Sequence, residues 1–356
     1  MPRLSAAVLV TFMLSFGCDA PSGPPEMIPG TPAGIVPGPS RWAPWIKRNT
    51  AVFSGQYSVS SDPSICREGS MYTMHYTGLD PDTNRTILCA ATSPDGLNWH
   101  EIESDVRIKG LVLNGKSGQW DENLESGFAV PWKGKTYLYY SGYRDEGTPA
   151  KGFPACLGLA TSDDGKNFAR VSKKPILDPS PGGHDCDAIY SAVIFPDGDQ
   201  LGMVYVGHAY TNKSGPAGVF LLGATSKDGM KWTKRAEPVL APMPKLPWTK
   251  DGVAEPALLK GPDGAWYLFF TGLKDEERVI GVARGKSPYG PWEINPAPIV
   301  APSTGTFDEH QALAPAVLVE GNTVRMWYLG ANKDGSLACG YAEAPWPIYS
   351  GDGEKK

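Results

Sequence analysis

The stretch DGVAEPALLK (residues 251–260), with the turn GPDG (261–264) and the segment AWYLFFTG (265–272) after it, decides the fold of this chain. It places a carboxylate at the start of a short apolar strand, turns at Pro-Asp-Gly, and continues into an aromatic strand that ends on a glycine. The same outline recurs at residues 62–78, 127–142, 191–207 and 314–330. The closing glycines are 64, 65, 65 and 58 residues apart, and self-similarity at a near-constant period predicts an architecture built from repeats.

Each repeat carries a second recurring piece after its aromatic strand. Three copies contain Ala-Thr-Ser and then Asp-Gly, namely CAATSPDGLNW (89–99), LATSDDGKNF (159–168) and GATSKDGMKW (223–232). A looser copy lies at 282–292. Asp-Gly between apolar segments predicts a hairpin, because glycine accepts the positive φ that such turns need. We expect the aromatic residue three positions after that glycine to pack on the next repeat.

Four strands in each of five repeats predict an all-β fold, a five-bladed β-propeller of four-stranded antiparallel blades. A β-solenoid and a tandem of small sandwiches are the alternatives, and repeats of this length fit blades better. The fifth repeat ends at Trp346 without a fourth strand. Residues around 45–57 are therefore predicted to complete that blade and close the ring, and residues 52–59 to form a strand that leads into the first repeat.

The 356 residues divide into three predicted parts. Residues 1–18 resemble a bacterial lipoprotein signal, in which Arg3 precedes an apolar run too short for a membrane span and Cys18 is the lipidation site. Residues 19–44 are rich in Pro, Gly, Ser and Ala, a composition typical of a tether. Residues 45–350 are expected to form the propeller domain. The expected location is the bacterial cell envelope, facing the periplasm or the cell surface, with ordinary secretion as the alternative.

The charge of the chain argues against several partners. The net charge of -5 and the pI near 5.6 leave no basic footprint for nucleic acid. No polybasic run marks a membrane-surface site, so we expect contact with a membrane only through the lipid anchor. The sequence contains no C-x-x-C spacing of the kind that would indicate a zinc or redox site. We expect a monomer.

The starts of the innermost strands of a propeller converge on one central funnel. Acids and histidines are dense at those positions: Asp62, Glu125, His184, Asp185, Asp187, Glu255, Asp308, Glu309 and His310. Like charges held close raise one another's pKa, which lets one carboxyl act as an acid and another as a base. Recurrence of Trp-Asp-Glu at 120–122 and Phe-Asp-Glu at 307–309 indicates a structural role for Asp121 and Asp308. His75, inside an aromatic strand, is also expected to be structural.

These features resemble the five-bladed propeller glycosidases of the arabinanase, xylosidase, levansucrase and invertase group, glycoside hydrolase family 43 and its relatives. The resemblance covers roughly residues 52–346. Asp62-Pro63 and Glu255-Pro256 match the base (or nucleophile) and the general acid of that group. The group's third carboxylate comes from the third blade, for which Asp187 is the best match, with Asp185 and Glu125 as alternatives.

Two departures from the family pattern stand out. The third-blade acid of the group usually precedes a proline, whereas Tyr190-Ser191 occupy that register here. The flanking residues match neither the Asn-Asp-Pro-Asn nor the Arg-Asp-Pro motif of the invertase type. A furanoside or xyloside substrate is therefore favoured over sucrose or a fructan.

The resemblance implies cleavage of glycosidic bonds in oligo- or polysaccharides, with inversion favoured, with Asp62 as the base, Glu255 as the acid and Asp187 as the third catalytic carboxylate. The candidate substrate-binding residues are Trp120, Glu125, His184, Asp185 and His310. No cofactor is expected to be required, and a structural calcium ion on the axis is compatible with these residues. A non-catalytic carbohydrate-binding propeller lipoprotein and a related glycoside phosphorylase are the alternatives.

Overall fold

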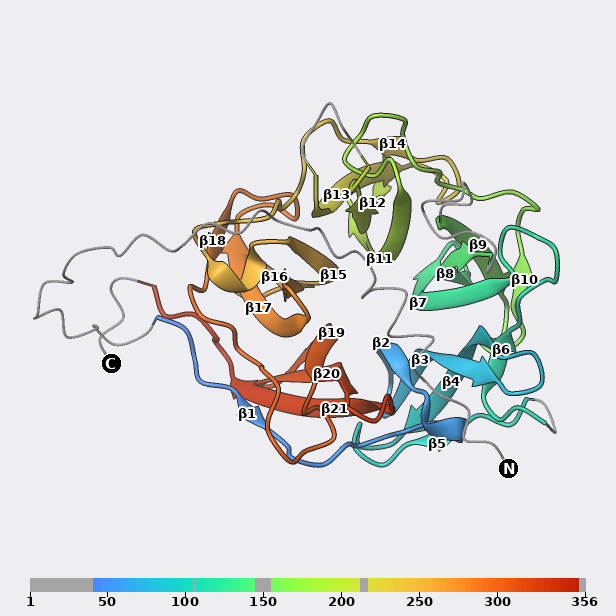
Figure 1. Ribbon diagram of the computed structural model, residues 1–356, viewed down its shortest axis with the longest axis horizontal. Coiled ribbons are helices and arrows are strands. Elements are labelled where there is room, and N and C mark those ends of the chain that lie inside the picture. The colour runs from blue at the N-terminus through green and yellow to red at the C-terminus, as the bar shows by residue number, and fades with distance from the viewer. Residues whose placement is uncertain (1–40, 105–106, 145–154, 212–216, 352–356) are drawn as a thin grey trace, which may run out of the picture.

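The computed structural model describes residues 41–104, 107–144, 155–211 and 217–351, which form five blades in a ring around a central axis (Figure 1). The predicted signal peptide, Cys18 and most of the tether lie outside the described residues. Within the described ranges the helices are short 3₁₀ turns, and none is long and apolar enough to cross a membrane. The predicted all-β, five-bladed propeller is confirmed.

In each blade the first strand lies on the axis and later strands follow outward. Blade 1 contains β2 (Ser61–Glu68), β3 (Met71–Asp80), β4 (Arg85–Ser93), β5 (His100–Glu101) and β6 (Leu111–Leu113). Blade 2 contains β7 (Asn123–Trp132), β8 (Lys135–Tyr143), β9 (Cys156–Ser162) and β10 (Ala169–Arg170). Blade 3 contains β11 (Ala188–Asp197), β12 (Gln200–His208), β13 (Val219–Ser226) and β14 (Thr233–Lys234).

Blade 4 contains β15 (Gly252–Lys260), β16 (Trp266–Lys274), β17 (Glu277–Gly285) and β18 (Trp292–Ile294). Blade 5 contains β19 (Gln311–Glu320), β20 (Thr323–Ala331), β21 (Leu337–Pro345) and, from the start of the described chain, β1 (Ile46–Lys47). Four blades have the predicted four strands. Blade 1 departs from the prediction, because β5 and β6 both pair with β4.

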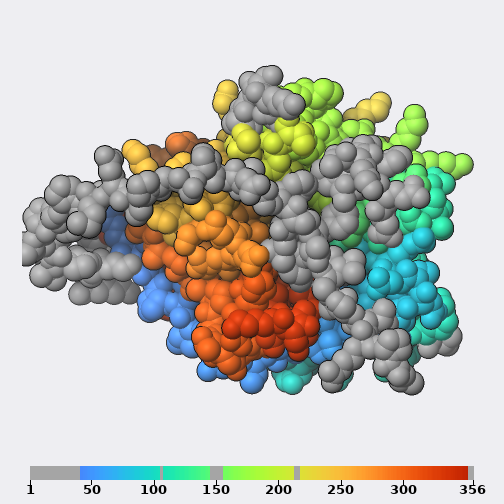
Figure 2. Space-filling model, viewed as in Figure 1, coloured from blue at the N-terminus to red at the C-terminus, as the bar shows by residue number. Residues whose placement is uncertain are grey.

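The ring closes between the two ends of the described chain, as predicted. β1 pairs antiparallel with β21, with Ile46 opposite Glu343 and Lys47 opposite Ala342. In Figure 2 the blue residues that begin the described chain lie against the orange and red of the fifth blade. The Lys47 ammonium also forms an ion pair of 2.7 Å with the buried Asp308 carboxylate. Backbone pairing with β21 and this ion pair therefore both hold the outer strand of the fifth blade.

The strand predicted for residues 52–59 is wrong. Phe53 forms a single bridge to Cys339, and Gln56–Ser58 form a 3₁₀ turn. The backbone has positive φ at three of four successive residues, Gly55, Tyr57 and Ser58, which interrupts a regular extended strand. The chain therefore bends here, between the outer edge of blade 5 and the axis of blade 1.

In blades 2, 4 and 5 the closing glycine of the aromatic strand makes room for the turn that precedes the blade. A Cβ at Gly142 would come within 2.6 Å of the Trp120 ring, and one at Gly272 within 2.3 Å of the Trp248 ring. Gly330 is covered by Phe307 in the same way, at 2.3 Å. Any side chain at these positions would displace an aromatic ring, which is why the glycine recurs.

An aspartate in three of these turns ties the blade together. Its carboxylate accepts a hydrogen bond of 2.9–3.0 Å from a tyrosine hydroxyl of the second strand and pairs with a cation of the outermost strand. The three sets are Asp121–Tyr140–Arg170, Asp185–Tyr205–Lys234 and Asp308–Tyr328–Lys47. The structural role predicted for Asp121 and Asp308 is confirmed, and Asp185 makes the same contacts.

The Asp-Gly turns join neighbouring blades. Gly96 and Gly229 have the predicted positive φ, 73° and 76°. The Gly96 carbonyl accepts hydrogen bonds from the indole N–H of Trp99 in its own blade and of Trp327 in blade 5. The aromatic residue after the turn thus packs on the preceding repeat, not on the next one as predicted. Sequence order shows which blades are neighbours, but the twist of the sheet decides which face each turn meets.

The Lys47–Asp308 pair gives a direct test of ring closure. Replacing Lys47 by Met leaves the Asp308 carboxylate buried without its cation, and we expect the free energy of unfolding to fall by about 3–5 kcal/mol. Chemical denaturation followed by tryptophan fluorescence measures this loss. The exposed pair Lys333–Glu309 is the matched control, for which Lys333→Met should cost less than about 1 kcal/mol. Equal, small losses in both variants would contradict the role given to Lys47.

Candidate active site

One position of the innermost strand has the same unusual backbone in all five blades. Its φ is 50°, 53°, 33°, 48° and 50° at Asp62, Ser126, Ser191, Glu255 and Ala314, in that order. Each of these residues lies at a bulge, where the register with the second strand shifts. Positive φ is uncommon for residues other than glycine, and a bulge re-aims the side chain that it carries. The repeated bulge turns one side chain of every blade toward the axis.

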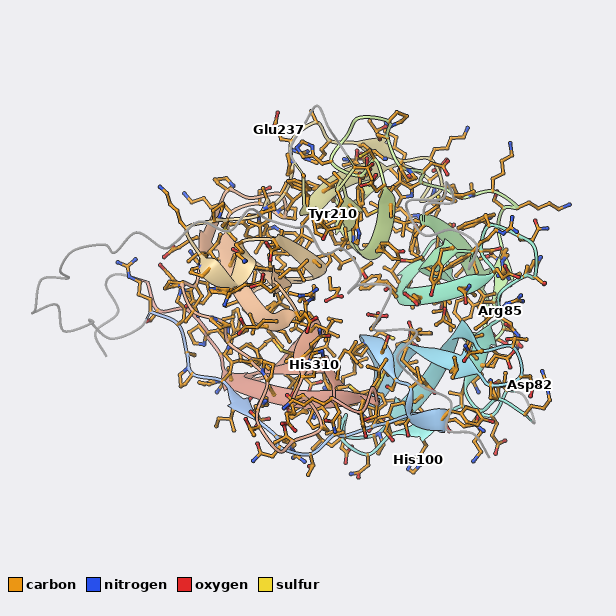
Figure 3. The ribbon with its side chains drawn as sticks, in the orientation of Figure 1. Asp82, Arg85, His100, Tyr210, Glu237 and His310 are labelled. Carbon is orange, nitrogen blue, oxygen red and sulfur yellow. The ribbon has the colours of Figure 1, made fainter. Side chains whose placement is uncertain are left out.

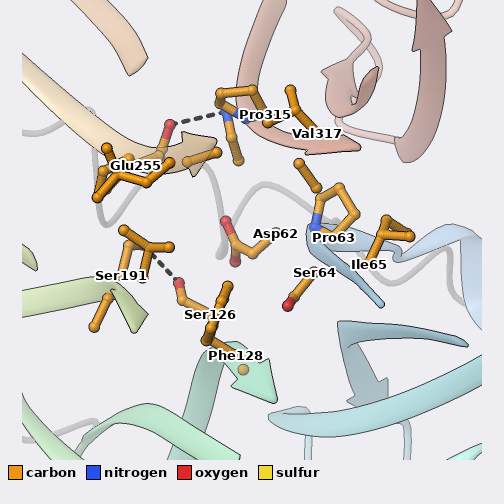
Figure 4. A pocket seen from close by; sticks show the side chains of 18 of the residues that line it. Asp62, Pro63, Ser64, Ile65, Ser126, Phe128, Ser191, Glu255, Pro315 and Val317 are labelled. Carbon is orange, nitrogen blue, oxygen red and sulfur yellow. Dashed lines mark hydrogen bonds between the residues drawn. The ribbon is translucent and has the colours of Figure 1, made fainter. Parts of the chain in front are cut away.

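These five residues line one axial cavity of about 200 Å³ (Figure 4). Asp62 and Glu255 supply its carboxyl groups, and Ser126 and Ser191 supply hydroxyls that hydrogen bond to each other at 2.9 Å. The residues that follow along the strands are mostly apolar, with Pro63, Ile65, Phe128, Pro256, Pro315 and Val317 among them. A few convergent polar groups in an apolar setting are typical of a small-molecule site.

Asp62 is surrounded by hydrogen-bond donors. Its Oδ2 accepts hydrogen bonds from the hydroxyls of Ser61, at 2.8 Å, and Thr77, at 3.1 Å. Burial raises the pKa of this carboxyl, while the donors, including Ser126 of the next blade, oppose that rise. Donors that bind the charged form favour it, so Asp62 is set up as the ionised partner.

Glu255 is also held by two donors on one oxygen, but its other oxygen is buried and unpartnered among the described residues. It is 4% exposed; Oε2 accepts from the Thr271 hydroxyl at 2.5 Å and from the Ala314 N–H at 3.1 Å. Within the described residues, Oε1 meets no hydrogen-bond partner. Burial first, and then the charge of Asp62, raises the pKa of Glu255 to about 7. Glu255 therefore keeps its proton in mildly acidic solution and is about half protonated at pH 7.

A third carboxyl comes from blade 2. Glu125 directly precedes the axial Ser126 and accepts a hydrogen bond of 2.6 Å from the Tyr143 hydroxyl. Burial and the charge of Asp62 raise the pKa of Glu125 to about 8, so this group is mostly neutral at pH 7. Three carboxyls thus share one region, in which burial and, after it, the negative charge of Asp62 raise the pKa of the other two.

The structure does not bring Asp187 to the axial position. The Thr211 N–H donates to its Oδ2 at 2.8 Å, and the Thr211 hydroxyl donates to its Oδ1. The third-blade residue equivalent to Asp62 is Ser191, because the bulge falls there. Asp187 precedes β11 and holds the segment that follows β12.

The other predicted substrate-binding residues lie in or near the turns that precede the blades (the entry turns). Trp120 is stacked on Tyr140 with ring centroids 6.1 Å apart, and His184 packs edge-on against Phe220 at 4.8 Å. Asp185 is bound to Tyr205 and Lys234, as described above. None of these three lines the axial cavity. His310 is half-buried ahead of β19 (Figure 3).

Several residues of the site were missed in the sequence. Ser126 and Ser191 lie 16 residues before their closing glycines, Gly142 and Gly207, as Asp62 lies 16 before Gly78. Aligning the repeats on those glycines would have located them. Arg278, buried beside Glu255, carried no such signal; its guanidinium donates to the carbonyls of Asp275 and Glu277, and its charge lowers the pKa of Glu255.

The part of the chain that the structure describes contains no group of three or more His, Cys, Asp or Glu side chains arranged to hold a metal ion. The calcium ion considered on the axis stays a prediction.

Comparisons with known proteins show which solved structures the fold resembles. No protein-family model matches the chain, and no curated protein matches it by sequence. A thermostable family-43 glycoside hydrolase superposes with a TM-score of 0.63 at 19% identity, covering 83% of this chain and 96% of that chain. The endo-arabinase from Bacteroides thetaiotaomicron gives 0.58 at 18% identity, covering 83% and 95%. The β-1,2-mannobiose phosphorylase from Listeria innocua gives 0.61 at 13%, covering 84% and 90%. The predicted likeness to family 43 is confirmed for the fold.

The raised pKa values make a prediction about stability. Glu125 and Glu255 bind protons up to about pH 8 and about pH 7 in the folded chain, against an ordinary value of 4.5. The folded state therefore holds more protons than the unfolded state in this range, and the free energy of unfolding falls as pH rises. Between pH 6.5 and 8 we expect a fall of up to about 1.4 kcal/mol per pH unit for each group.

The buried histidines act with the opposite sign in the lower part of this window. Burial lowers the pKa of His75 and His208 to about 4, whereas in the unfolded state they are about half protonated at pH 6.5. Their contribution fades as pH rises towards 8, and it is the same in wild type and in a variant that changes only the glutamates, so it cancels in that comparison. Urea denaturation at several pH values measures the slope. The double variant Glu125→Gln/Glu255→Gln should flatten it, and an unchanged slope in that variant would show that neither carboxyl titrates in this range.

Proposed function

We propose that this protein hydrolyses glycosidic bonds in oligo- or polysaccharides of the furanoside or xyloside type, with inversion. Glu255 is the general acid and Asp62 is the general base. One observation carries the proposal: the two carboxyls occupy equivalent bulge positions in blades 1 and 4, face one cavity, and differ in the number of hydrogen-bond donors around them, with more donors at Asp62. The similarity of the fold to glycoside hydrolases supports it.

The reaction follows from the protonation states. The neutral Glu255 donates its proton to the glycosidic oxygen as the bond to the anomeric carbon breaks. The ionised Asp62 removes a proton from a water molecule that attacks the opposite face of the sugar. The proton gained by Asp62 and the proton lost by Glu255 are then exchanged with solvent. The negative charge of Asp62 also favours the oxocarbenium-like character of the sugar in the transition state.

Glu125 is proposed to bind substrate in its neutral form. With Oε1 held by the Tyr143 hydroxyl, a protonated carboxyl can donate a hydrogen bond to a sugar hydroxyl. Asp187 is proposed as a positioning residue, which holds Thr211 at the segment after β12. The three carboxyls near the axis then have three different tasks.

The first test uses Glu255→Gln and Asp62→Asn on aryl arabinofuranosides and aryl xylosides at pH 6. We expect each variant to lose about 10²–10⁴-fold in kcat, because acid–base assistance is removed. Aryl groups that leave easily need little protonation, so Glu255→Gln should lose less on a nitrophenyl glycoside than on an unactivated disaccharide. Asp62→Asn should lose equally on both. Proton NMR of the first-formed anomer checks inversion.

The matched control is Ser191→Ala, which changes the equivalent axial position of blade 3 without touching a carboxyl. It should keep turnover within a few-fold. An active protein whose turnover requires inorganic phosphate would be a phosphorylase, for which the buried Arg278 beside Glu255 is the available cation. Sugar binding without turnover in wild type, unchanged by Glu255→Gln, would instead identify a carbohydrate-binding propeller.

The protonated state of Glu125 has its own consequence. Because glutamine is a neutral isostere of the protonated acid, Glu125→Gln should keep kcat within about tenfold of wild type at pH 6 and raise mainly KM. Glu125→Ala, which also removes the hydrogen-bonding group, should raise KM further. Steady-state kinetics on the same aryl glycoside measures both. A loss in Glu125→Gln as large as in Glu255→Gln would mean that Glu125 works as a charged group.

A further inference from the structure

The interface between blades 1 and 2 lacks a contact that two other interfaces have. Between blades 5 and 1, the Trp327 indole N–H donates to the Gly96 carbonyl at 2.6 Å. Between blades 2 and 3, the Tyr139 hydroxyl donates to the Gly229 carbonyl at 2.9 Å. The register of the second strands puts His75 at the same position in blade 1.

The turn on the other side of this interface is changed as well. Trp99 and Trp232 donate their indole N–H to the glycine carbonyl of their own turn. Blade 2 has Phe168 at that position, which has no donor. Gly165 is also less closely packed, since a Cβ there would meet its nearest neighbour at 3.9 Å, against 2.7 Å at Gly96 and 2.8 Å at Gly229.

These two replacements leave a cavity of about 580 Å³ between blades 1 and 2. His75 and Thr92 line it from blade 1, and Trp132 and the turn that contains Gly165 line it from blade 2. It shares no lining residue with the axial cavity. Its volume is in the usual range for sites that hold a small molecule, about 300–1,000 Å³.

Buried polar groups in this cavity have no partner. His75 is 2% exposed, and among the described residues neither Nδ1 nor Nε2 has a hydrogen-bond partner. The buried indole Nε1 of Trp132 also meets none within that part of the chain. Buried polar atoms are nearly always paired, and an unpaired one costs free energy, so a cavity with three of them is suited to a polar ligand.

The charges and hydrogen-bonding groups indicate the class of ligand. Three lysines (Lys133, Lys135, Lys166) and three acids (Glu68, Asp163, Asp164) line the cavity, which leaves it without an excess of either sign. Burial lowers the pKa of His75, so its neutral ring offers one N–H donor and one bare nitrogen acceptor. A group that both donates and accepts, such as a hydroxyl, matches this pair.

We propose that the cavity between blades 1 and 2 is a second carbohydrate-binding site for a neutral unit of one or two sugars. It contains no counterpart of the Asp62–Glu255 pair, so it binds without cleaving. The role of His75 is then to bind sugar, beyond the structural role expected for it. Such a site would hold a polysaccharide chain on the protein while another part of the chain is processed in the axial cavity.

The experiment titrates the full chain, as Glu255→Gln, with D-xylose, L-arabinose and D-galactose. The indole ¹⁵N–¹H resonance of Trp132, assigned from Trp132→Phe, reports on this cavity. We expect a saturable shift with at least one of the three sugars. His75→Tyr restores the residue of blade 2 at this position and fills the cavity, so it should abolish the shift and raise the melting temperature.

Asp62→Asn separates this proposal from the proposed catalytic function. It changes the axial cavity alone and should leave the Trp132 shift unchanged, whether or not the protein proves to be a hydrolase. If His75→Tyr fails to fold, His75→Phe takes its place, with binding at least tenfold weaker expected. No saturable shift with any of the three sugars, or a shift that survives loss of the His75 nitrogens, would overturn the proposal.

Discussion

The bulge in every innermost strand is the constraint on which the rest of the site depends. A regular strand alternates its side chains between two faces, so an unbroken strand could point a residue at a neighbouring blade but not hold it on the axis. The left-handed φ at Asp62 and Glu255, shared by Ser126, Ser191 and Ala314, re-aims one side chain per blade. Hydroxyls of the second strands stabilise this geometry between blades, as Thr77 does when it accepts from the Ser126 N–H at 3.0 Å.

Electrostatics then differentiates chemically similar groups in this small space. Each of the two carboxyls accepts two hydrogen bonds on one oxygen. Ser126 adds further donors at Asp62, whereas Oε1 of Glu255 is buried and meets no partner among the described residues, so the environment separates their protonation states. The charge of Asp62 extends the effect to Glu125 in blade 2. Burial is the larger cause of the raised pKa values of Glu125 and Glu255, and the charge of Asp62 adds to it. The charge of the buried Arg278 lowers the pKa of Glu255 in turn.

Repetition distinguishes structural residues from functional ones in this chain. Several features recur because the blades that share them pack in the same way. They are the aspartates of the entry turns, the closing glycines and the Asp-Gly turns. The carboxyls at the axial position occur in two blades only, where the others have Ser or Ala. The interface between blades 1 and 2 is a similar exception, since His75 and Phe168 replace residues that elsewhere close the gap. In a repeat protein, a departure from the repeat is the place to look for chemistry.

The sequence by itself determined the number of blades, their strand order and the two main carboxyls. These are local properties: periodic glycines, turn residues and a Pro after Asp62 and Glu255 can be read one segment at a time. The sequence predicted four strands for blade 1 and missed the fifth, β6, which pairs with β4 across a long connection. It also failed at residues 52–59, where positive φ values break an apparently regular strand.

Only the tertiary structure decided which third carboxyl lies near Asp62 and Glu255. It also decided which neighbouring blade each Asp-Gly turn contacts. Asp187 lies at a plausible spacing, but Thr211 binds it and the bulge selects Ser191 instead. Glu125 reaches the charge of Asp62 because blades 1 and 2 are adjacent and their bulges are in register. Burial, the source of the raised pKa values, is likewise a property of the assembled ring and of no single segment, since every blade contributes part of the wall.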